Sequence, residues 1–403
     1  MRFVALLLII LTANNDIVAQ NNDLRTILKF NNSFKKYSFN DINYNNLDSI
    51  VVLDLSKQNL TKIPKIVYKL NNLQYLILSE NEIKNIPSKI NKLERLKIFS
   101  ISENKLKKIP NPLTKLDSIL IIGAGNNEIK SISKNIGNLK QMIALDLSSN
   151  NIETLPHSIS ELESLEKLQL YQNKLTGLPS SFYKTKELEY LGISQNELLA
   201  LPDSFGHGQK IVLLELMGNK LSELPSSFSE LKNLNKLRLS NNNFSVFPEE
   251  LTKMNRLRIL DLMYNNLREI PEDIGNMEYL NQLGLGYNNI VSIPSSITRL
   301  RRLDNLDLFH NDIEIFPIYV LSIKSLTSFG LGYNKITEIP NIDVDHSNLK
   351  YLHLERNSLM KPPYSVLNLQ NLEYLYLGKD DFSKELQEEI KEKFKGKCRV
   401  YFD

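Results

Sequence analysis

The sequence has a single cysteine, Cys398, among its 403 residues, and it has no tryptophan. A lone cysteine excludes an internal disulfide framework and a zinc site built from several thiolates. The formal net charge is only +3, from 49 basic and 46 acidic residues. This balance gives no electrostatic reason to expect nucleic acid or an anionic membrane as a partner.

Long apolar runs are also scarce. The clearest one, at residues 3–11, follows Arg2 and is followed by polar residues and the small residue Ala19. This order is typical of a secretory signal, and the run is shorter than the roughly 20 apolar residues that a membrane-spanning helix needs. We therefore predict a signal peptide at residues 1–19, no membrane insertion, and a secreted, cell-surface or periplasmic protein. A cytoplasmic protein is the alternative.

The dominant feature of the sequence is an internal repeat of 23 residues. Its register begins at Ile50 and holds without insertion through fifteen starts, the last of which is Leu372. Alternating apolar residues at the fourth and sixth positions predict a short strand with one buried face. Because every repeat advances the chain in the same direction, these strands must be parallel. Proline recurs at the fifteenth position, and its missing N–H favours an irregular outer segment.

Asparagine at the ninth position is the most specific element of the repeat. A carboxamide offers two donors and an acceptor, so it can satisfy backbone groups of its own turn and of the next coil. Only the end repeats depart from the pattern, with Gln58 and Asp380. We interpret the column as a structural ladder and not as a binding site. The ladder consists of Asn81, Asn104, Asn127, Asn150, Asn173, Asn196, Asn219, Asn242, Asn265, Asn288, Asn311, Asn334 and Asn357.

The full pattern resembles the 23-residue class of the leucine-rich repeat family, Leu-x-x-Leu-x-Leu-x-x-Asn-x-Leu-x-x-Leu-Pro-x-x-Ile-x-x-Leu, found in bacterial and Ras-suppressor-like proteins. The resemblance covers residues 50–382. It implies the α/β class and a curved, horseshoe-like solenoid with a parallel sheet on the concave side. Ser133, which replaces a proline, and Gly208 and His346, which replace an outer leucine, are expected to loosen the convex side. The family shares a scaffold more than a function, so the resemblance names no partner.

The segments that flank the repeats are expected to cover the ends of the stack. Residues 20–49 are polar and rich in asparagine, and we predict that they form an N-terminal cap from the outer half of a degenerate first coil. Residues 383–403 begin with apolar residues at helical spacing and predict a C-terminal cap made of a helix and a strand. Continuing the repeat places Cys398 and Val400 at the inward positions of that strand.

Signals of catalysis are missing. There is no Gly-x-Ser-x-Gly, His-Glu-x-x-His or phosphate-loop motif. Some secreted bacterial members of the family carry a ubiquitin-ligase domain, and the 21 residues after Phe382 are too few to build one. His310 and His353 lie two coils apart, about 10 Å, which is too far to share a zinc ion. We predict no catalytic residue, no cofactor and no metal.

A partner would be recognised by the variable positions that face out of the sheet, namely the third, fifth, seventh and eighth of each repeat. In repeats ten to fourteen the eighth position changes to aromatic and basic residues. Tyr and Arg are enriched at binding hot spots, although tyrosine also suits an exposed sheet for its β-propensity alone. The predicted partner-binding residues are Tyr264, Tyr287, Phe309, His310, Tyr333, Tyr351, His353, Arg356 and Tyr374, with Asp261 and Asp307 as acceptors.

These observations predict an exported, non-enzymatic protein that holds a protein or a surface glycan on its concave face. A second hypothesis is a structural spacer or adhesin component, whose repeats serve as length. A third is an intracellular signalling scaffold, which would require residues 1–19 to be retained. The identity of the partner and the oligomeric state remain open.

Overall fold

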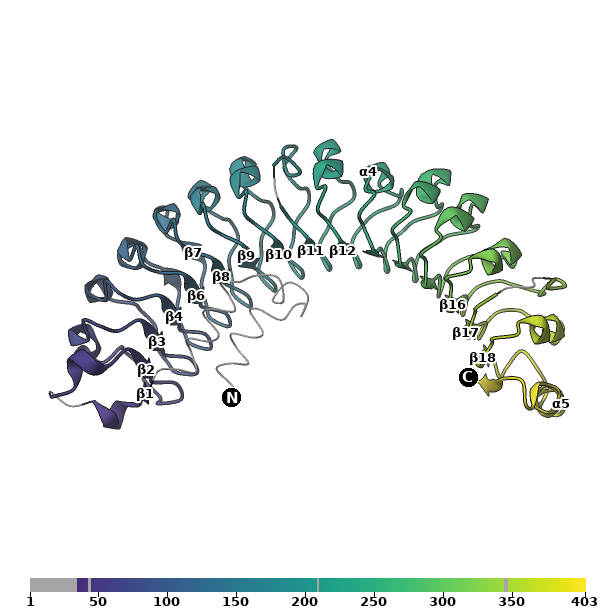
Figure 1. The fold of residues 1–403 in the computed structure, drawn as a ribbon, viewed down its shortest axis with the longest axis horizontal. Helices are drawn as coiled ribbons and strands as arrows, with labels where there is room; N and C mark the ends of the chain where they lie inside the picture. Colours follow the sequence, from purple (N-terminus) through teal and green to yellow (C-terminus); the bar gives the residue numbers. More distant parts are fainter. Residues whose placement is uncertain (1–34, 43–44, 209, 344–346) are drawn as a thin grey trace. The chain divides into compact units, whose positions relative to one another are not determined.

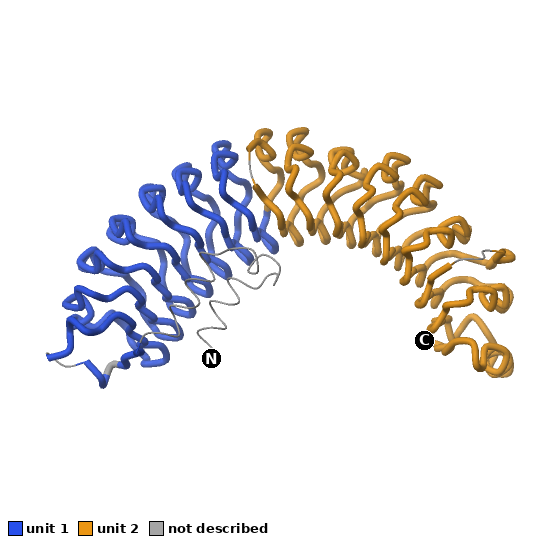
Figure 2. The backbone as a smooth tube through the Cα atoms, viewed as in Figure 1, with its two compact units in different colours: residues 1–197 blue, residues 198–403 orange. Residues whose placement is uncertain are grey.

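The computed structural model describes residues 35–42, 45–208, 210–343 and 347–403. The expected signal peptide lies outside these residues, as does much of the expected N-terminal cap. The chain divides into two compact units, residues 1–197 and residues 198–403, coloured blue and orange in Figure 2. Each unit is a stack of coils with a short strand on one side and a short helix on the opposite side (Figure 1).

The strands pair with one another in parallel along each unit. In unit 1 the sheet consists of β1 (Lys36–Tyr37), β2 (Val52–Asp54), β3 (Tyr75–Ile77), β4 (Ile98–Ser100), β6 (Ile121–Gly123), β8 (Ala144–Asp146), β9 (Lys167–Gln169) and β10 (Tyr190–Gly192). In unit 2 it consists of β11 (Leu213–Glu215), β12 (Lys236–Arg238), β13 (Ile259–Asp261), β14 (Gln282–Gly284), β15 (Asn305–Asp307), β16 (Ser328–Gly330), β17 (Tyr351–His353), β18 (Tyr374–Leu377) and β19 (Arg399–Phe402).

The register between neighbouring strands repeats the spacing of the sequence. Leu260 pairs with Leu283, and Leu283 with Leu306, so inward leucines superimpose from coil to coil. All three are at most 1% exposed. Burial of one such side chain contributes about 2 kcal/mol, and the repeat supplies several per coil. The arrangement confirms the prediction of a repeat solenoid built on a parallel sheet.

Short helices lie on the side away from the sheet, and most begin directly after the recurrent proline, whose fixed φ suits a helix start. Unit 1 contains η1 (Phe39–Asp41), η2 (Leu47–Ser49), η3 (Lys65–Lys69), η4 (Ser88–Lys92), η5 (Asn111–Lys115), η6 (Ile136–Asn138), η7 (His157–Glu161) and η8 (Ser180–Lys184). Unit 2 contains η9 (Ser226–Glu230), α4 (Glu249–Thr252), η10 (Glu272–Asn276), η11 (Ser295–Arg299), η12 (Ile318–Ser322), η13 (Tyr364–Asn368) and α5 (Lys384–Phe394).

The replacement of proline by Ser133 changes the outer segment of its coil, where helix η6 has three residues and most of the other outer helices have five. Strands β5 (Lys108–Ile109) and β7 (Ser131–Ile132) form a separate two-stranded sheet. The Ser133 N–H donates to the Ile109 carbonyl at 2.9 Å. Proline has no N–H, so serine allows a hydrogen bond that the other repeats cannot make here. At Gly208 a turn stands in place of the outer helix, and His346 lies outside the described residues.

The two ends depart from the expected phase. Near the N-terminus, residues 36–37 form strand β1, which pairs with β2, so the first coil has a strand as well as an outer half. Near the C-terminus, β19 sets Val400 opposite Leu375, whereas continuing the repeat would put Cys398 there. The segment between β18 and β19 contains helix α5 and is two residues longer than a repeat allows. Cys398 therefore precedes the strand and is only partly buried.

Candidate partner-binding face

The eighth position of the repeat has a left-handed backbone in all of the first fourteen repeats. Its φ lies between +52° (Ser149) and +59° (Gln195) wherever the residue is not glycine, and it is +68° at Gly218. This conformation turns the chain three residues after the end of the strand, just before the buried asparagine of the ninth position. The side chain of the eighth position remains on the outside of the turn, next to its counterparts in the neighbouring coils.

A left-handed backbone is unfavourable for most side chains. It costs about 1 kcal/mol for an ordinary residue, and glycine and asparagine tolerate it best. Gly218 and Asn241 fit this requirement, but the next four repeats carry Tyr264, Tyr287, His310 and Tyr333. Folding does not require rings at these positions, and strain retained in this way is a reason to look for function.

We call Tyr264, Tyr287, His310 and Tyr333 the aromatic ladder, because their rings stack from coil to coil. Centroid distances are 4.1 Å, 4.7 Å and 5.7 Å along the series, with interplanar angles of 11°, 19° and 9°. A hydrogen bond with the Tyr264 side chain raises the pKa of Tyr287. Tyr264 and Tyr333 are 50% and 42% exposed. The ladder is thus a preformed surface that a partner can contact without ordering flexible side chains.

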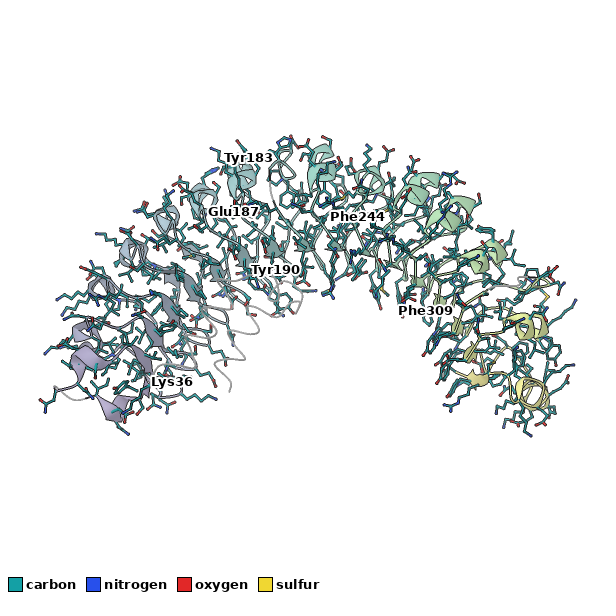
Figure 3. The ribbon with its side chains drawn as sticks, in the orientation of Figure 1. Lys36, Tyr183, Glu187, Tyr190, Phe244 and Phe309 are labelled. Carbon is teal, nitrogen blue, oxygen red and sulfur yellow. The ribbon has the colours of Figure 1, made fainter. Side chains whose placement is uncertain are left out.

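Phe309 extends the ladder toward the sheet. It occupies the seventh position of its repeat, and its ring lies 5.0 Å from that of Tyr333 and 6.4 Å from that of Tyr287. Figure 3 shows Phe309 on the strand-lined side of unit 2. It joins the end of the ladder to the exposed face of β15 and β16.

A second aromatic group covers β17, β18 and β19. We call it the terminal stack. Its close pairs are Tyr351 with Tyr374 at 5.0 Å, His353 with Tyr376 at 4.2 Å, and Tyr376 with Tyr401 at 5.2 Å. Sequence reasoning did not include Tyr376 or Tyr401. Tyr376 shares the fifth position with His353 and could have been found from it, whereas Tyr401 enters the stack only through the two-residue shift of β19.

Arg356 stands apart from the other expected contact residues. Its guanidinium donates to Asp380 at 2.6 Å, so it is directed toward the segment after β18. The expected role of Arg356 as a donor to a partner would require this ion pair to open. Both side chains are well exposed, and a pair of this kind contributes at most about 1 kcal/mol.

Asp261 and Asp307, the two expected acceptors, each accept a backbone N–H of their own coil. Asp261 accepts the Met263 N–H at 3.0 Å and the Ser240 hydroxyl at 2.9 Å. Asp307 accepts the Phe309 N–H at 2.9 Å. Burial raises the pKa of Asp307, and the hydrogen bond from Phe309 opposes that rise.

The ladder makes a prediction about stability. Replacing Tyr333 by asparagine is expected to leave the free energy of unfolding within about 0.5 kcal/mol of the wild-type value, because relief of the left-handed strain offsets the lost ring contacts. Replacing it by alanine loses the contacts and keeps the strain, so it should cost about 1 kcal/mol. Urea unfolding followed by circular dichroism compares the two variants. An alanine variant as stable as the asparagine variant would contradict the strain argument.

Among the described residues, Cys398 does not have the features of a catalytic nucleophile. Burial raises the pKa of Cys398 to about 11, so its thiol is protonated at neutral pH and is a poor nucleophile. Across the part of the chain that the structure describes, His, Cys, Asp and Glu do not gather in groups of three or more that could hold a metal. A separate search of the same residues finds no helix suited in length and hydropathy to crossing a membrane.

Comparisons with known proteins agree with the repeat. Sequence profiles described as "Leucine rich repeat" match residues 120–175, 255–313 and 233–254. No curated protein matches the chain. Among solved structures, a leucine-rich repeat protein of Leptospira interrogans superposes with a TM-score of 0.79 at 28% identity, covering 92% of this chain and all of that one.

Two receptor complexes are also similar. The plant peptide hormone receptor RGFR1, solved with RGF2, has a TM-score of 0.67 at 28% identity over 86% of this chain and 65% of the receptor. Toll of Drosophila, solved with Spatzle, has a TM-score of 0.67 at 25% identity over 81% of this chain and 49% of that one. The present chain therefore spans about half to two thirds of the length of these receptor chains.

Proposed function

Because the chain is a leucine-rich repeat protein, we propose that it is an exported, non-enzymatic binding protein that holds a protein partner on the exposed sheet face of unit 2. The aromatic ladder carries the proposal. It consists of exposed rings, stacked in advance, at backbone positions that would be less strained with asparagine or glycine.

The similar structures support a protein as the partner. RGFR1 and Toll are each solved in complex with the ligand that their titles name. The aromatic content of the face is also typical of protein interfaces, where tyrosine supplies a large contact area and immobilises few rotors. A surface glycan would use the same rings and is the alternative outcome of the binding experiment. Export rests on the sequence of residues 1–19.

The deciding experiment compares two baits in affinity capture from the native medium, namely residues 20–403 with and without the paired change Tyr287→Asn and Tyr333→Asn. The affinity of each captured protein or glycan is then measured with the purified baits. We expect the paired change to weaken binding about 30-fold, which corresponds to about 2 kcal/mol. Asparagine is the better replacement because it suits the left-handed backbone.

The matched control carries Gln172→Asn and Gln195→Asn, which introduce the same residue at the same repeat position in unit 1, where φ is +53° and +59°. It should bind as the wild type does. Equal affinity of all three baits would refute the proposed face and favour a structural spacer. An intracellular scaffold would instead be favoured if N-terminal sequencing of the natural protein found residues 1–19 still attached.

A further inference from the structure

Glu355 is a buried carboxylate on the partner-binding face of unit 2. Its side chain is only 8% exposed. Oε1 lies 3.2 Å from His353 Nδ1, while Oε2 has no hydrogen-bond partner among the described residues. A buried carboxylate oxygen without a donor costs free energy. Because Oε2 has almost no exposed surface in the structure, a donor from outside the chain would satisfy it once the Glu355 side chain turned outward.

Two glycines in the preceding coil create the space in which Glu355 lies. A Cβ atom on Gly332 would sit 2.9 Å from Glu355 Cδ and 2.4 Å from Cε2 of Phe309. A Cβ atom on Gly330 would sit 3.2 Å from Asp307 Oδ1. Side chains from the coils on either side therefore lie over Gly330, at the end of β16, and over Gly332, two residues beyond it.

We call the space over Gly330 and Gly332 the glycine slot. The flanking strands β15 and β17 are two strand spacings apart, about 10 Å, and β16 forms the floor. The slot is bordered by Asp307 and Phe309 on one side and by His353 and Glu355 on the other.

The charges around the slot are predominantly negative. Burial raises the pKa of Asp307, and the nearby carboxylates of Asp261 and Glu355 act in the same direction. The Phe309 N–H and the charge of His353 act against them. A bound cation would counter the mutual repulsion of the Asp307 and Glu355 carboxylates.

We propose that the glycine slot binds the guanidinium group of an arginine side chain on the partner, an inference that rests on the proposed function of this face. A guanidinium is planar, donates from two edges and stacks on rings. It can therefore bridge Asp307 and Glu355 while lying against Phe309 or His353. The lysine ammonium is a compact and strongly hydrated point charge, which cannot make the same bridge. The slot thus assigns an exposed arginine to the partner.

Ligand-observed NMR with the full chain tests the slot directly, because it detects millimolar affinities. The probes are acetyl-Gly-Arg-Gly-amide and the same peptide with lysine or with citrulline, which is neutral and nearly isosteric with arginine. The arginine peptide should bind at least tenfold more tightly than either of the others. Arginine binding no tighter than citrulline binding would overturn the proposal, and equal binding of lysine would overturn the choice of guanidinium.

Two variants localise the effect. Glu355→Gln and Asp307→Asn should each weaken binding of the arginine peptide at least tenfold. Unfolding experiments should show the Glu355→Gln variant to be at least as stable as the wild type, because the substitution removes a buried charge. Asp54→Asn is the control, since Asp54 shares the repeat position of Asp307 and likewise accepts the N–H two residues on. Arginine binding that survives both slot substitutions would overturn the proposal.

The outcome is separable from that of the proposed function. A captured partner that depends on the aromatic ladder but binds Glu355→Gln and Asp307→Asn normally would leave the face established and refute the slot. Arginine-peptide binding at the slot, with partner capture indifferent to the ladder, would refute the proposed face and retain the slot as a cation site.

Discussion

Replacing Asn288 by alanine is expected to lower the free energy of unfolding of unit 2 by about 4 kcal/mol. Its Oδ1 accepts the Leu267 N–H at 2.9 Å, and its Nδ2 donates to the carbonyls of Leu262 and Leu285, both at 3.0 Å. Each such bond is worth about 1 kcal/mol net, and each buried group left without a partner costs about 1–3 kcal/mol more. Because one side chain joins its own coil to the preceding one, its loss is felt beyond its own repeat.

The neighbouring residue provides the control for this prediction. The Asn289 side chain is exposed. The backbone N–H of Asn289 donates to the Leu267 carbonyl, and this bond does not depend on the side chain. Asn289→Ala should therefore change stability by less than about 0.5 kcal/mol. Urea unfolding followed by circular dichroism measures both variants. Similar losses at positions 288 and 289 would mean that the buried amide contributes little and that apolar packing alone fixes the coil.

The apolar core and the column of buried asparagines were predictable from sequence because both depend on a single fixed spacing. Once Leu260 and Leu283 occupy the same repeat position, the pairing of their strands follows. The strain at the eighth position was not evident in this way. Asn126, Gly218 and Asn241 hint at a left-handed backbone, but a column that also holds tyrosine and arginine hides the conformational requirement. Only the φ values of the structure show that the backbone, and not the surface, imposes this requirement.

Features that depend on departures from the spacing could not be predicted. The position of Tyr401 in the terminal stack follows from the length of the segment that contains α5, which no repeat constrains. The burial of Glu355 depends on glycine at position 332, one coil earlier, and on His353 two residues before it. Charged residues on a repeat face are usually solvated, so sequence alone favours an exposed Glu355.

The aromatic ladder and the glycine slot together specify more features of the partner than either does alone. The ladder follows the ends of strands β13 to β16, and the slot lies on the face of β16, with Phe309 contacting both Tyr333 and the space over Gly332. A partner that covers the rings would bring its own side chains to the slot. An arginine flanked by apolar residues is therefore the sequence feature to look for in any protein captured on this face.

The terminal stack depends on the packing of helix α5, and Phe394→Ala is expected to lower the free energy of unfolding of unit 2 by about 4 kcal/mol. Phe394 and Ile390 are completely buried on one side of the helix, and truncating a buried phenylalanine to alanine costs about 3–5 kcal/mol. The helix start, where the Ser383 hydroxyl accepts the Leu386 N–H at 3.3 Å, cannot replace that packing. Hydrogen exchange read along unit 2 locates the loss.

We expect faster exchange in β18 and β19, which carry Tyr376 and Tyr401. Exchange in β13 and β14, beneath the start of the aromatic ladder, should be unchanged, because stability in a repeat array is transmitted mainly between neighbouring coils. Lys384→Ala, on the exposed side of the same helix, is the matched control and should change stability by less than about 0.5 kcal/mol. Uniformly faster exchange from β11 to β19 would contradict this expectation, because unit 2 would then open as one cooperative body. In that case a change in the terminal stack would alter the ladder as well, and the two aromatic groups could not be tested separately by mutation.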